Sequence, residues 1–343
     1  MKQKIKKMIL KIYVKVKYLE FLKYTSYCKK NEQFKYIVFN TPTHGNIGDH
    51  AIIIAEQKLF QNLKLKIYEV PTLISDYLFG KIKTKINNED VICITGGGFI
   101  GSIWLQEENI VNEVLTSFKN NKIIIFPQTI YFDETEKGKI EFEKFKTNVN
   151  NCKNLTICLR ENTSLSYVKN NITSKNVIFV SDIVLYLKNY YKFKEEKKGV
   201  LMCLRKDVEK SLSEDKQKRI EKFLKTKYLK IDYTDTVINK NILPKNRESY
   251  LTKTLKEFSR YELVVTDRLH GMIFSILTNT PCIVLGNFNY KVKGVYECIK
   301  EKENVIFLED VDNLEKYYEQ IIKEKKLSNS YDYEKLIEKI INK

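Results

Sequence analysis

The sequence predicts an α/β protein of two Rossmann-like, doubly wound domains that face each other across a cleft, preceded by a basic amphipathic helix. Short apolar runs alternate with longer amphipathic ones, which is the pattern of a parallel sheet flanked by helices. The length of 343 residues exceeds the size at which one hydrophobic core usually keeps growing, so two domains are favoured. A change of composition between Leu187 and Gly199, where Tyr, Lys and Glu replace the apolar pattern, marks the linker between them.

The first expected element is a helix over residues 1–33 that carries much of the positive charge. Residues 1–30 hold ten lysines and a single acidic residue, Glu20. Such a helix either lies on an anionic membrane surface or docks on its own domain, and the sequence leaves both alternatives open. Apolar residues recur at helical spacing on one face and lysines on another, in the sets Ile5, Met8, Ile12, Val16, Leu19 and Lys4, Lys7, Lys11, Lys15.

We expect neither a signal peptide nor a transmembrane helix. Lysines interrupt every candidate apolar run near the start, and no small-residue cleavage site follows. No other stretch approaches the roughly 18 uninterrupted apolar residues that a transmembrane helix needs. The expected location is therefore cytoplasmic, with peripheral contact at the inner face of the plasma membrane as the option that the basic helix leaves open.

Two series of apolar runs define the expected domains. The first domain covers residues 34–190, with strands at Tyr36–Phe39, Val91–Ile94, Ile123–Phe126, Leu155–Leu159 and Val177–Val180. The second covers residues 199–311, with strands at Val200–Leu204, Tyr228–Ile231, Leu263–Val265 and Cys282–Leu285. Residues 312–343 have a charged helical pattern, and we expect this segment to pack back across the first domain.

Composition narrows the possible functions. The net charge of +17 comes from lysine enrichment alongside many Ile and Asn, which a compositional bias of the genome can produce, so nucleic acid is not an expected partner. The seven cysteines are an odd number without CxxC spacing, and Cys93, Cys158, Cys203 and Cys282 lie in apolar runs, as expected of buried thiols in a reducing compartment. Three scattered histidines without paired-ligand spacing do not indicate a metal site.

Two glycine-rich segments follow predicted strands of the first domain. Around Asn46, Gly48 and Asp49, glycines permit close backbone approach, and the next segment begins a helix whose free amides can bind an anion; an ordinary tight turn is the alternative. The triple glycine Gly96, Gly97, Gly98 removes every β-carbon from what we expect to be a turn, which favours a ligand over a steep chain reversal. Trp104 follows and either stacks on a sugar ring or belongs to the core.

Charged side chains follow four other strands. Arg160 and Arg205 each lie just beyond a strand, where a guanidinium can bind carboxylate or phosphate oxygens or form a surface charge. Asp182 occupies a similar position and can act as a base or an orienting group. In Thr266–Gly271, Arg268 can bind an anion and His270 can move a proton near neutral pH; we favour this over a structural histidine. His44 and His50 are weaker candidates.

The order of these motifs resembles that of the polysaccharide pyruvyl transferase family. No single motif is specific to the family. The resemblance depends on the order of all the motifs along the chain, which together cover roughly residues 35–295. The matching pieces are Gly45–Asp49, Gly96–Gly98, Pro127-Gln128, Arg160-Glu161 with Ser164, Ser181-Asp182, Arg205, Arg268–Gly271, Pro281 and Lys291.

The resemblance implies two Rossmann-type domains in a glycosyltransferase-B-like arrangement and a specific reaction. The pyruvyl group of phosphoenolpyruvate would move, as a ketal, to a sugar of a surface polysaccharide or of its lipid-linked precursor. The donor carries a carboxylate and a phosphate, so arginines must neutralise both ends, and its methylene carbon must accept a proton. No nicotinamide, pyridoxal or metal cofactor is required.

The resemblance also assigns roles to residues. Arg268 would bind the donor anion and His270 would protonate its methylene carbon, while Arg160 and Arg205 are further anion clamps. Ile183-Val184 departs from the small pair that follows the aspartate in many relatives, which weakens a direct role for Asp182. The glycine segments would shape the cleft near the acceptor, so the expected substrate-binding residues also include Asn46, Gly48, Asp49, Gly96, Gly97 and Gly98. Lys291, which completes the pattern of motifs, is a further expected substrate-binding residue.

Two other functions compete with this one. A glycosyltransferase of the same architecture would use a nucleotide sugar, because fold alone does not determine function. A non-catalytic scaffold at the membrane surface would keep the fold without turnover. The retained Arg268, His270 and glycine segments argue against the scaffold, and the order of motifs argues against the glycosyltransferase.

Overall fold

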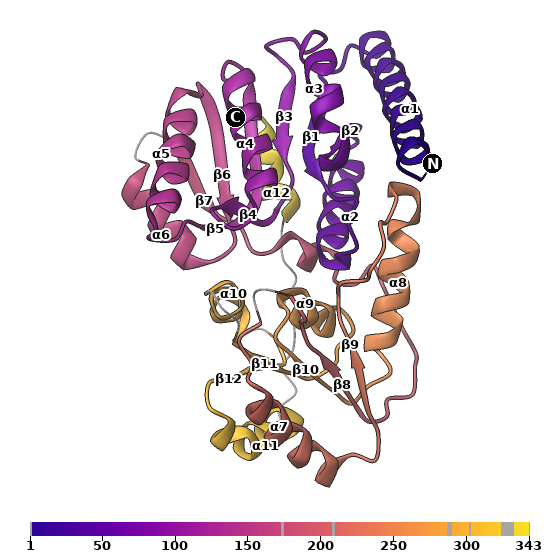
Figure 1. Cartoon of the computed structure of the whole chain (residues 1–343), viewed down its shortest axis with the longest axis vertical. Coiled ribbons are helices and arrows are strands. Elements are labelled where there is room, and N and C mark those ends of the chain that lie inside the picture. The colour runs from indigo at the N-terminus through magenta and orange to yellow at the C-terminus, as the bar shows by residue number, and fades with distance from the viewer. Residues whose placement is uncertain are drawn as a thin grey trace.

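A computed structural model describes residues 2–172, 175–207, 210–286, 290–301, 303–323 and 333–342. Two parallel sheets form the centres of two α/β domains, which lie one above the other in Figure 1. The domains face each other across a cleft lined by residues of both, which is the glycosyltransferase-B-like arrangement that the resemblance implies. The fold class expected from the sequence is therefore confirmed.

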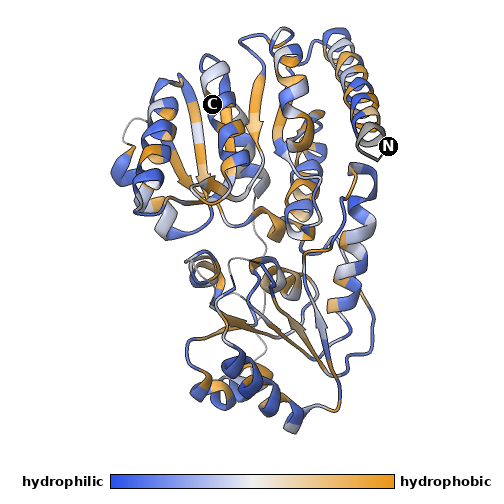
Figure 2. Cartoon of the chain, in the orientation of Figure 1, coloured by the Kyte–Doolittle hydropathy of each residue, from blue (hydrophilic) through white to orange (hydrophobic). Residues whose placement is uncertain are grey.

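The sheet of the first domain has the strand order β2-β1-β3-β5-β6-β7, with β4 paired to β5, and every pairing is parallel. Its strands are β1 (Tyr36–Thr41), β2 (Ile67–Pro71), β3 (Val91–Ile94), β4 (Gly97–Gly101), β5 (Lys122–Tyr131), β6 (Asn154–Leu159) and β7 (Asn176–Phe179). The flanking helices are α2 (Ile47–Asn62), α3 (Ser75–Lys83), α4 (Leu105–Ser117), α5 (Glu136–Asn151) and α6 (Asn162–Asn171). Helices cover both faces of the sheet, so central strands are apolar throughout, as Figure 2 shows.

The second sheet has the order β12-β11-β10-β8-β9 and is also parallel. Its strands are β8 (Val200–Cys203), β9 (Ile231–Thr234), β10 (Leu263–Thr266), β11 (Cys282–Leu285) and β12 (Val305–Leu308). The helices are α7 (Glu214–Lys227), α8 (Arg247–Phe258), α9 (Leu269–Leu277), α10 (Lys291–Ile299) and α11 (Leu314–Lys323). Short 3₁₀ helices are η1 (Thr72–Ile74), η2 (Ile183–Leu187), η3 (Pro244–Asn246) and η4 (Val311–Asn313).

Both sheets change winding direction at a point that faces the cleft. In the first sheet the chain runs from β1 outward to β2 and then returns to β3 on the other side of β1. In the second it runs from β8 to β9 and returns to β10 beside β8. Ligands of open α/β sheets bind outside the carboxyl ends of strands at such switch points. The segments that follow β1, β3, β8 and β10 are among those that the sequence singled out.

The N-terminal helix α1 (Lys2–Lys30) docks on the first domain, and it does so with a face that the sequence did not indicate. Val14, Phe21 and Cys28 are buried in the core of that domain, and α1 lies along its outer edge beside α3 (Figure 1). The expected apolar face points away: Met8 is 57% exposed, Ile12 56%, Val16 44% and Leu19 48%. The side chains of Lys4 and Ile5 lie outside the described residues. None of the described helices combines the length and apolar character needed to cross a bilayer.

The C-terminal segment is divided between the two domains. α11 packs against β11 and β12 of the second sheet, whereas α12 (Tyr333–Asn342) crosses to the first domain and contacts α2. Tyr333 is buried, and its hydroxyl donates a hydrogen bond of 2.6 Å to the carbonyl oxygen of Asp182. The helix α12 therefore braces the segment that joins the domains, close to the cleft.

Two expected elements differ from those observed. The strand expected at Tyr228–Ile231 begins only at Ile231, because Tyr228 still caps α7 and its amide bonds to the carbonyl of Leu224. The triple glycine is not wholly a turn: β4 begins at Gly97 and pairs with β5. Gly97 and Gly101 adopt φ values of +150° and +144°, which other residues rarely adopt, so glycine is needed at both ends of this strand.

Candidate functional site

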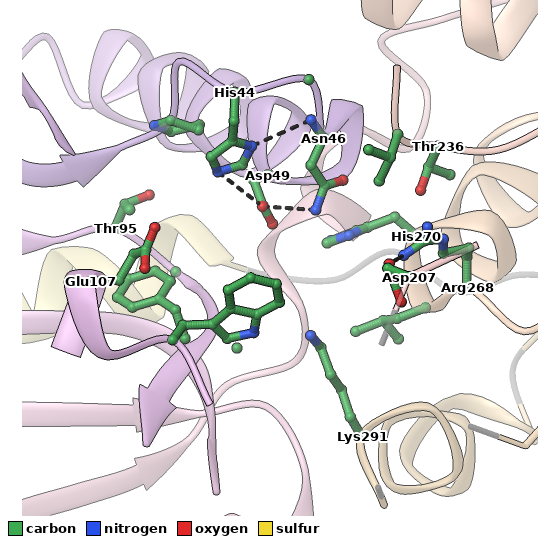
Figure 3. Close-up of a pocket in the computed structure, with 18 of the residues that line it drawn as sticks. His44, Asn46, Asp49, Thr95, Glu107, Asp207, Thr236, Arg268, His270 and Lys291 are labelled. Carbon is green, nitrogen blue, oxygen red and sulfur yellow. Dashed lines mark hydrogen bonds and ion pairs between the residues drawn. The ribbon is translucent and has the colours of Figure 1, made fainter. Parts of the chain in front are cut away.

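A cavity of about 380 Å³ lies between the two domains at both switch points (Figure 3). The segments after β1 and β3 line it from the first domain, and the segments after β8 and β10 line it from the second. The sequence-predicted residues that line it are Asn46, Asp49, Gly96, Gly98, Arg205, Arg268, His270 and Lys291. Arg160, Asp182, Gly48 and Gly97 lie behind this lining.

His270 stands in the first turn of α9 and is buried against the first domain. A β-carbon on Gly48 would lie 2.1 Å from its Nδ1, so Gly48 is required for the close packing of α2 on the imidazole ring. The Nε2 atom is 3.8 Å from Oδ2 of Asp182 and has no hydrogen-bond partner within the described part of the chain. Burial lowers the pKa of His270 to about 4, so the ring is neutral near pH 7.

Arg160 lies behind His270 and is almost completely buried, with 1% exposure. Its Nη1 donates to Asp182 at 2.5 Å and its Nε donates to the hydroxyl of Thr129 at 3.0 Å. Its Nη2 has no partner among the described residues. A β-carbon on Gly98 would lie 2.9 Å from that Nη2 and 2.8 Å from Nζ of Lys291. Gly98 therefore leaves room at the place where two cations converge beside His270.

Arg268 and Arg205 form a second charged group, together with two aspartates that sequence reasoning missed. Arg268 binds both oxygens of Asp235 at 2.8 Å and also pairs with Asp207. Arg205 donates to Asp207 at 2.9 Å. Since Asp207 follows β8 in a Lys-rich segment, it resembled an ordinary surface charge. The two arginines and two aspartates balance in charge, and Arg268 is held in one orientation at the pocket wall.

The first glycine segment is joined to the second domain by its backbone. Amides and carbonyls of this loop bond to the segment around Thr236 and Ile238, and a β-carbon on Gly45 would lie 1.8 Å from the Ile238 carbonyl oxygen. Close approach at Gly45 therefore serves the contact between the domains. Asn46 caps α2 by accepting from the Gly48 amide at 3.1 Å, and it donates to Asp49 at 2.8 Å.

Asp49 is an ionised carboxylate in this pocket. Burial alone would raise the pKa of Asp49, but His44, His270 and Lys291 outweigh it and hold the pKa below its usual value. Nε2 of His44 lies 3.6 Å from Oδ2 of Asp49, so this weaker candidate does contact a site residue (Figure 3). The carboxylate is thus a fixed negative charge on the first-domain side.

Glu56 supports the triple glycine from below. Its carboxyl accepts hydrogen bonds from the Gly96 amide at 2.8 Å and from the Thr95 hydroxyl at 2.9 Å. Burial raises the pKa of Glu56 to about 8. Gly97 does not contact the pocket, because its neighbour there is the ring of Phe99. Of the three glycines, only Gly98 faces the charged groups.

His50 has a structural role that sequence reasoning did not identify. Its Nδ1 accepts a hydrogen bond of 3.0 Å from Arg247 of α8, so its Nε2 carries the proton and donates to the His44 carbonyl at 2.8 Å. Arg247 also donates to the Pro42 carbonyl and pairs with Glu69. Burial lowers the pKa of His50 to about 4. Arg247 and His50 thus join the two domains beside the pocket, and nothing in the polar segment around Arg247 distinguishes it from a surface arginine.

Comparison with protein families identifies the family to which the chain is similar. The model of the family described as "Polysaccharide pyruvyl transferase" matches residues 46–290, which include every predicted site residue except Lys291. General stress protein 30 of Bacillus subtilis (strain 168) is 37% identical over 300 residues, covering 85% of this chain and 86% of that protein. Pyruvyl transferase 1 of Schizosaccharomyces pombe is 24% identical over 306 residues, covering 82% and 74%.

The fold also recurs among solved structures. A functionally uncharacterised protein of Klebsiella pneumoniae superposes with a TM-score of 0.58 at 20% sequence identity, covering 84% of this chain and 98% of that one. At this identity the likeness concerns the fold alone.

Proposed function

The chain belongs to the polysaccharide pyruvyl transferase family, and we propose that it transfers the pyruvyl group of phosphoenolpyruvate to two hydroxyls of a sugar, forming a ketal. The acceptor sugar would be part of a surface polysaccharide or of its lipid-linked precursor. The chemistry requires groups that hold two anions and one group that delivers a proton to carbon. No cofactor is required for these steps.

One observation carries the proposal. Nη2 of Arg160 and Nε2 of His270 are both buried without a hydrogen-bond partner among the described residues, and Lys291 approaches the same place. Buried polar atoms are almost always paired, so unpaired polar atoms beside a cavity favour a ligand that pairs with them. An anionic ligand fits because two of the three groups are cations.

The donor would lie between the two charged groups. We assign one of its anionic groups to the space in front of Gly98, between Arg160 and Lys291. The other would face Arg268 and Arg205. Asp182 is buried behind His270 and does not line the pocket, so we assign it to positioning: it pairs with Arg160 and supports the imidazolium from 3.8 Å.

The steps balance without an added reactant. The His270 imidazolium protonates the methylene carbon, which makes the neighbouring carbon electrophilic. One sugar hydroxyl adds there, the bond to phosphate breaks, and the second hydroxyl adds to complete the ketal. Of the two hydroxyl protons released, one restores His270 and the other leaves with phosphate. The ionised Asp49 stands on the acceptor side, where it can accept a hydroxyl proton.

Acceptor-dependent release of phosphate tests this function. The full chain is incubated with phosphoenolpyruvate and with glycan extracted from cells that lack the protein, and phosphate is measured while mass spectrometry follows the glycan. We expect phosphate release only with glycan, together with a pyruvyl increment in mass. Arg268→Ala and His270→Ala should lose both signals while remaining folded, whereas the exposed Arg260→Ala should keep them. Full activity in both site variants would refute the assignment.

We further propose that the exposed face of α1 places the enzyme on an anionic membrane surface. Ile9, Ile12 and Val16 point away from the domain, and exposed lysines Lys7, Lys11 and Lys15 stand on the same helix. Apolar side chains enter the boundary between headgroups and acyl chains, and each lysine near the surface adds about 1 kcal/mol of attraction.

Vesicle flotation tests the membrane proposal. The full chain should float with vesicles that contain phosphatidylglycerol and should not float with phosphatidylcholine alone. The double variant Ile12→Glu, Val16→Glu should lose flotation. Ile140→Glu, which alters an equally exposed apolar residue on α5, is the matched control and should float normally. Equal flotation of all variants, or none at all, would overturn the proposal.

A further inference from the structure

Asn40, the next-to-last residue of β1, has a strained conformation at the wall of the pocket. Its φ is +62°, in the left-handed region that residues other than glycine rarely adopt. It is only 4% exposed, and its Oδ1 has no hydrogen-bond partner among the described residues. Its Nδ2 donates to the backbone carbonyl of Glu107 at 3.0 Å. The side chain is thus fixed by one end while its acceptor oxygen is unsatisfied beside a cavity.

Trp104 stands immediately before α4 on the same wall. It lines the pocket, yet it is 41% exposed, so this indole is not part of the core. Exposed tryptophans in pockets typically contact ligands that present an apolar face and a polar edge, because the indole does the same. A pyranose ring has both. The sequence left open whether Trp104 stacks on a sugar or belongs to the core. Its exposure in the pocket favours stacking on a sugar.

Glu107 completes the group from the first turn of α4. It lines the pocket, and burial raises the pKa of its carboxyl. Figure 3 shows Glu107 and Thr95 across the pocket from Arg268 and Asp207. Among the pocket-lining residues of the first domain there is no lysine or arginine, whereas Asp49 and Glu107 are both acidic. This wall therefore disfavours a negatively charged sugar.

We propose that Asn40, Trp104 and Glu107 form a subsite for an uncharged pyranose ring. Trp104 stacks on one face of the ring, and the oxygens of Asn40 and Glu107 accept hydrogen bonds from its hydroxyls. The inference rests on the proposed function for the identity of this sugar as the acceptor. The binding of a sugar here is a separate claim, and it can be measured without turnover.

Tryptophan fluorescence tests the subsite directly, because Trp104 is the only tryptophan in the chain. Excitation at the red edge of the absorption band selects it over the tyrosines. The full chain is titrated with methyl glycosides of glucose, galactose, mannose and N-acetylglucosamine, and with methyl glucuronoside. We expect a saturable change in emission with at least one neutral glycoside and a much weaker response to the glucuronoside. No response to any neutral glycoside, or equal binding of the glucuronoside, would overturn the proposal.

A glycine substitution isolates the amide of Asn40. Asn40→Gly removes the amide but keeps a residue that tolerates the positive φ, so the fold should be retained. We expect roughly a tenfold loss of glycoside affinity, the effect of losing one hydrogen bond. Asn279→Gly is the matched control, because Asn279 also has a positive φ, of 50°, but stands at the turn after α9. Unchanged affinity in Asn40→Gly would refute the role of Asn40.

Titration with phosphoenolpyruvate in the same samples separates this inference from the proposed function. Binding of phosphoenolpyruvate without any glycoside response would refute the sugar subsite and leave the donor assignment intact. A glycoside response without binding of phosphoenolpyruvate would support the subsite and contradict the donor assignment.

Discussion

His270 is neutral in the protein without substrate, yet the proposed reaction needs its protonated form. Burial depresses its pKa to about 4, and the nearby Arg160 and Lys291 act in the same direction. A bound anion would neutralise these cations and favour the imidazolium, which Asp182 then supports from 3.8 Å. The site would therefore acquire its acid only when the donor is present.

We accordingly expect phosphoenolpyruvate binding to take up a proton. The pKa of His270 should rise on binding, so donor affinity should increase as the pH falls from 8 towards 6, still above the pKa of the free form. Isothermal titration calorimetry in buffers of different ionisation enthalpy measures the uptake. His270→Gln should bind with less uptake than the wild-type chain, and identical uptake in both proteins would contradict this account.

Gly98 leaves the space where the donor anion is expected to lie. An alanine methyl there would stand within 3 Å of both Lys291 and Arg160, and Arg160 is held in place by Asp182 and Thr129. We expect Gly98→Ala to raise the KM for phosphoenolpyruvate on the order of tenfold, or about 1.4 kcal/mol, with little change in Tm.

Gly80→Ala provides the matched control for Gly98→Ala. Gly80 lies in α3, where an added β-carbon meets nothing within 4 Å. Alanine there should leave KM unchanged and stabilise the helix by about 0.5–1 kcal/mol. If the two alanine variants had equal KM values, the space at Gly98 would have no part in donor binding.

At the scale of elements, two buried glutamates that bond to the backbone at the two ends of β4 make the stability of the fold depend on pH. Glu56 has a folded pKa of about 8 against an ordinary value of 4.5, and Glu108 is raised to about 8 in the same way. Between those values the folded chain holds a proton that the unfolded chain releases. Stability should therefore fall as the pH rises from 6.5 to 8, by up to about 1.4 kcal/mol per pH unit for each glutamate.

We expect Glu56→Gln to remove one of these two contributions. Urea unfolding at pH 6.5 and at pH 8 measures the difference in free energy, and the variant should lose less stability over this interval than the wild-type chain. His50 and His270 act in the opposite direction near pH 6.5, because the unfolded chain is still partly protonated there, but their contribution is the same in both proteins and cancels in the comparison. An unchanged pH dependence in the variant would contradict the raised pKa of Glu56.

The sequence predicted most elements of both sheets because buried parallel strands are nearly continuous apolar runs. β4 was not predicted, since three of its five residues are glycines and its apolar residues, Phe99 and Ile100, are too few to form a strand pattern. The docked face of α1 was not predicted either. It buries Val14, Phe21, Tyr24 and Cys28, whereas the apolar face that the sequence indicated is exposed. Periodicity identified the helix but could not tell which of its two apolar faces meets the domain.

At the scale of the whole molecule, the pocket depends on a fixed relation between the domains. Arg247 reaches from α8 to His50, Glu69 and the Pro42 carbonyl, and it is almost completely buried. Removing one partner of a buried ion pair leaves the other charge uncompensated. We expect Arg247→Met to lower the free energy of unfolding by about 3–5 kcal/mol, measured by urea denaturation.

Arg260→Met is the comparison for Arg247→Met. Arg260 pairs with Glu195 at the surface and is 54% exposed, so its loss should cost less than about 1 kcal/mol. Equal losses in the two variants would mean that Arg247 does not join the domains.

The sequence located the two walls of the site but not how their charges pair. Strand-end motifs indicated Arg160, Arg268 and His270, since open sheets place functional residues there. The neutralisation of Arg268 by Asp207 and Asp235 depends on three separate segments meeting in space, which no local pattern records. For the same reason Gly45 and Gly48 suggested a ligand, although they serve the contact between the domains.

Calorimetric titration with phosphoenolpyruvate and, separately, with nucleoside diphosphates tests the central claim most directly, because it distinguishes a pyruvyl donor from a nucleotide sugar. We expect the wild-type chain to bind phosphoenolpyruvate, Lys291→Met to bind it at least tenfold more weakly, and UDP and ADP not to bind. Binding of a nucleoside diphosphate without binding of phosphoenolpyruvate would contradict the account.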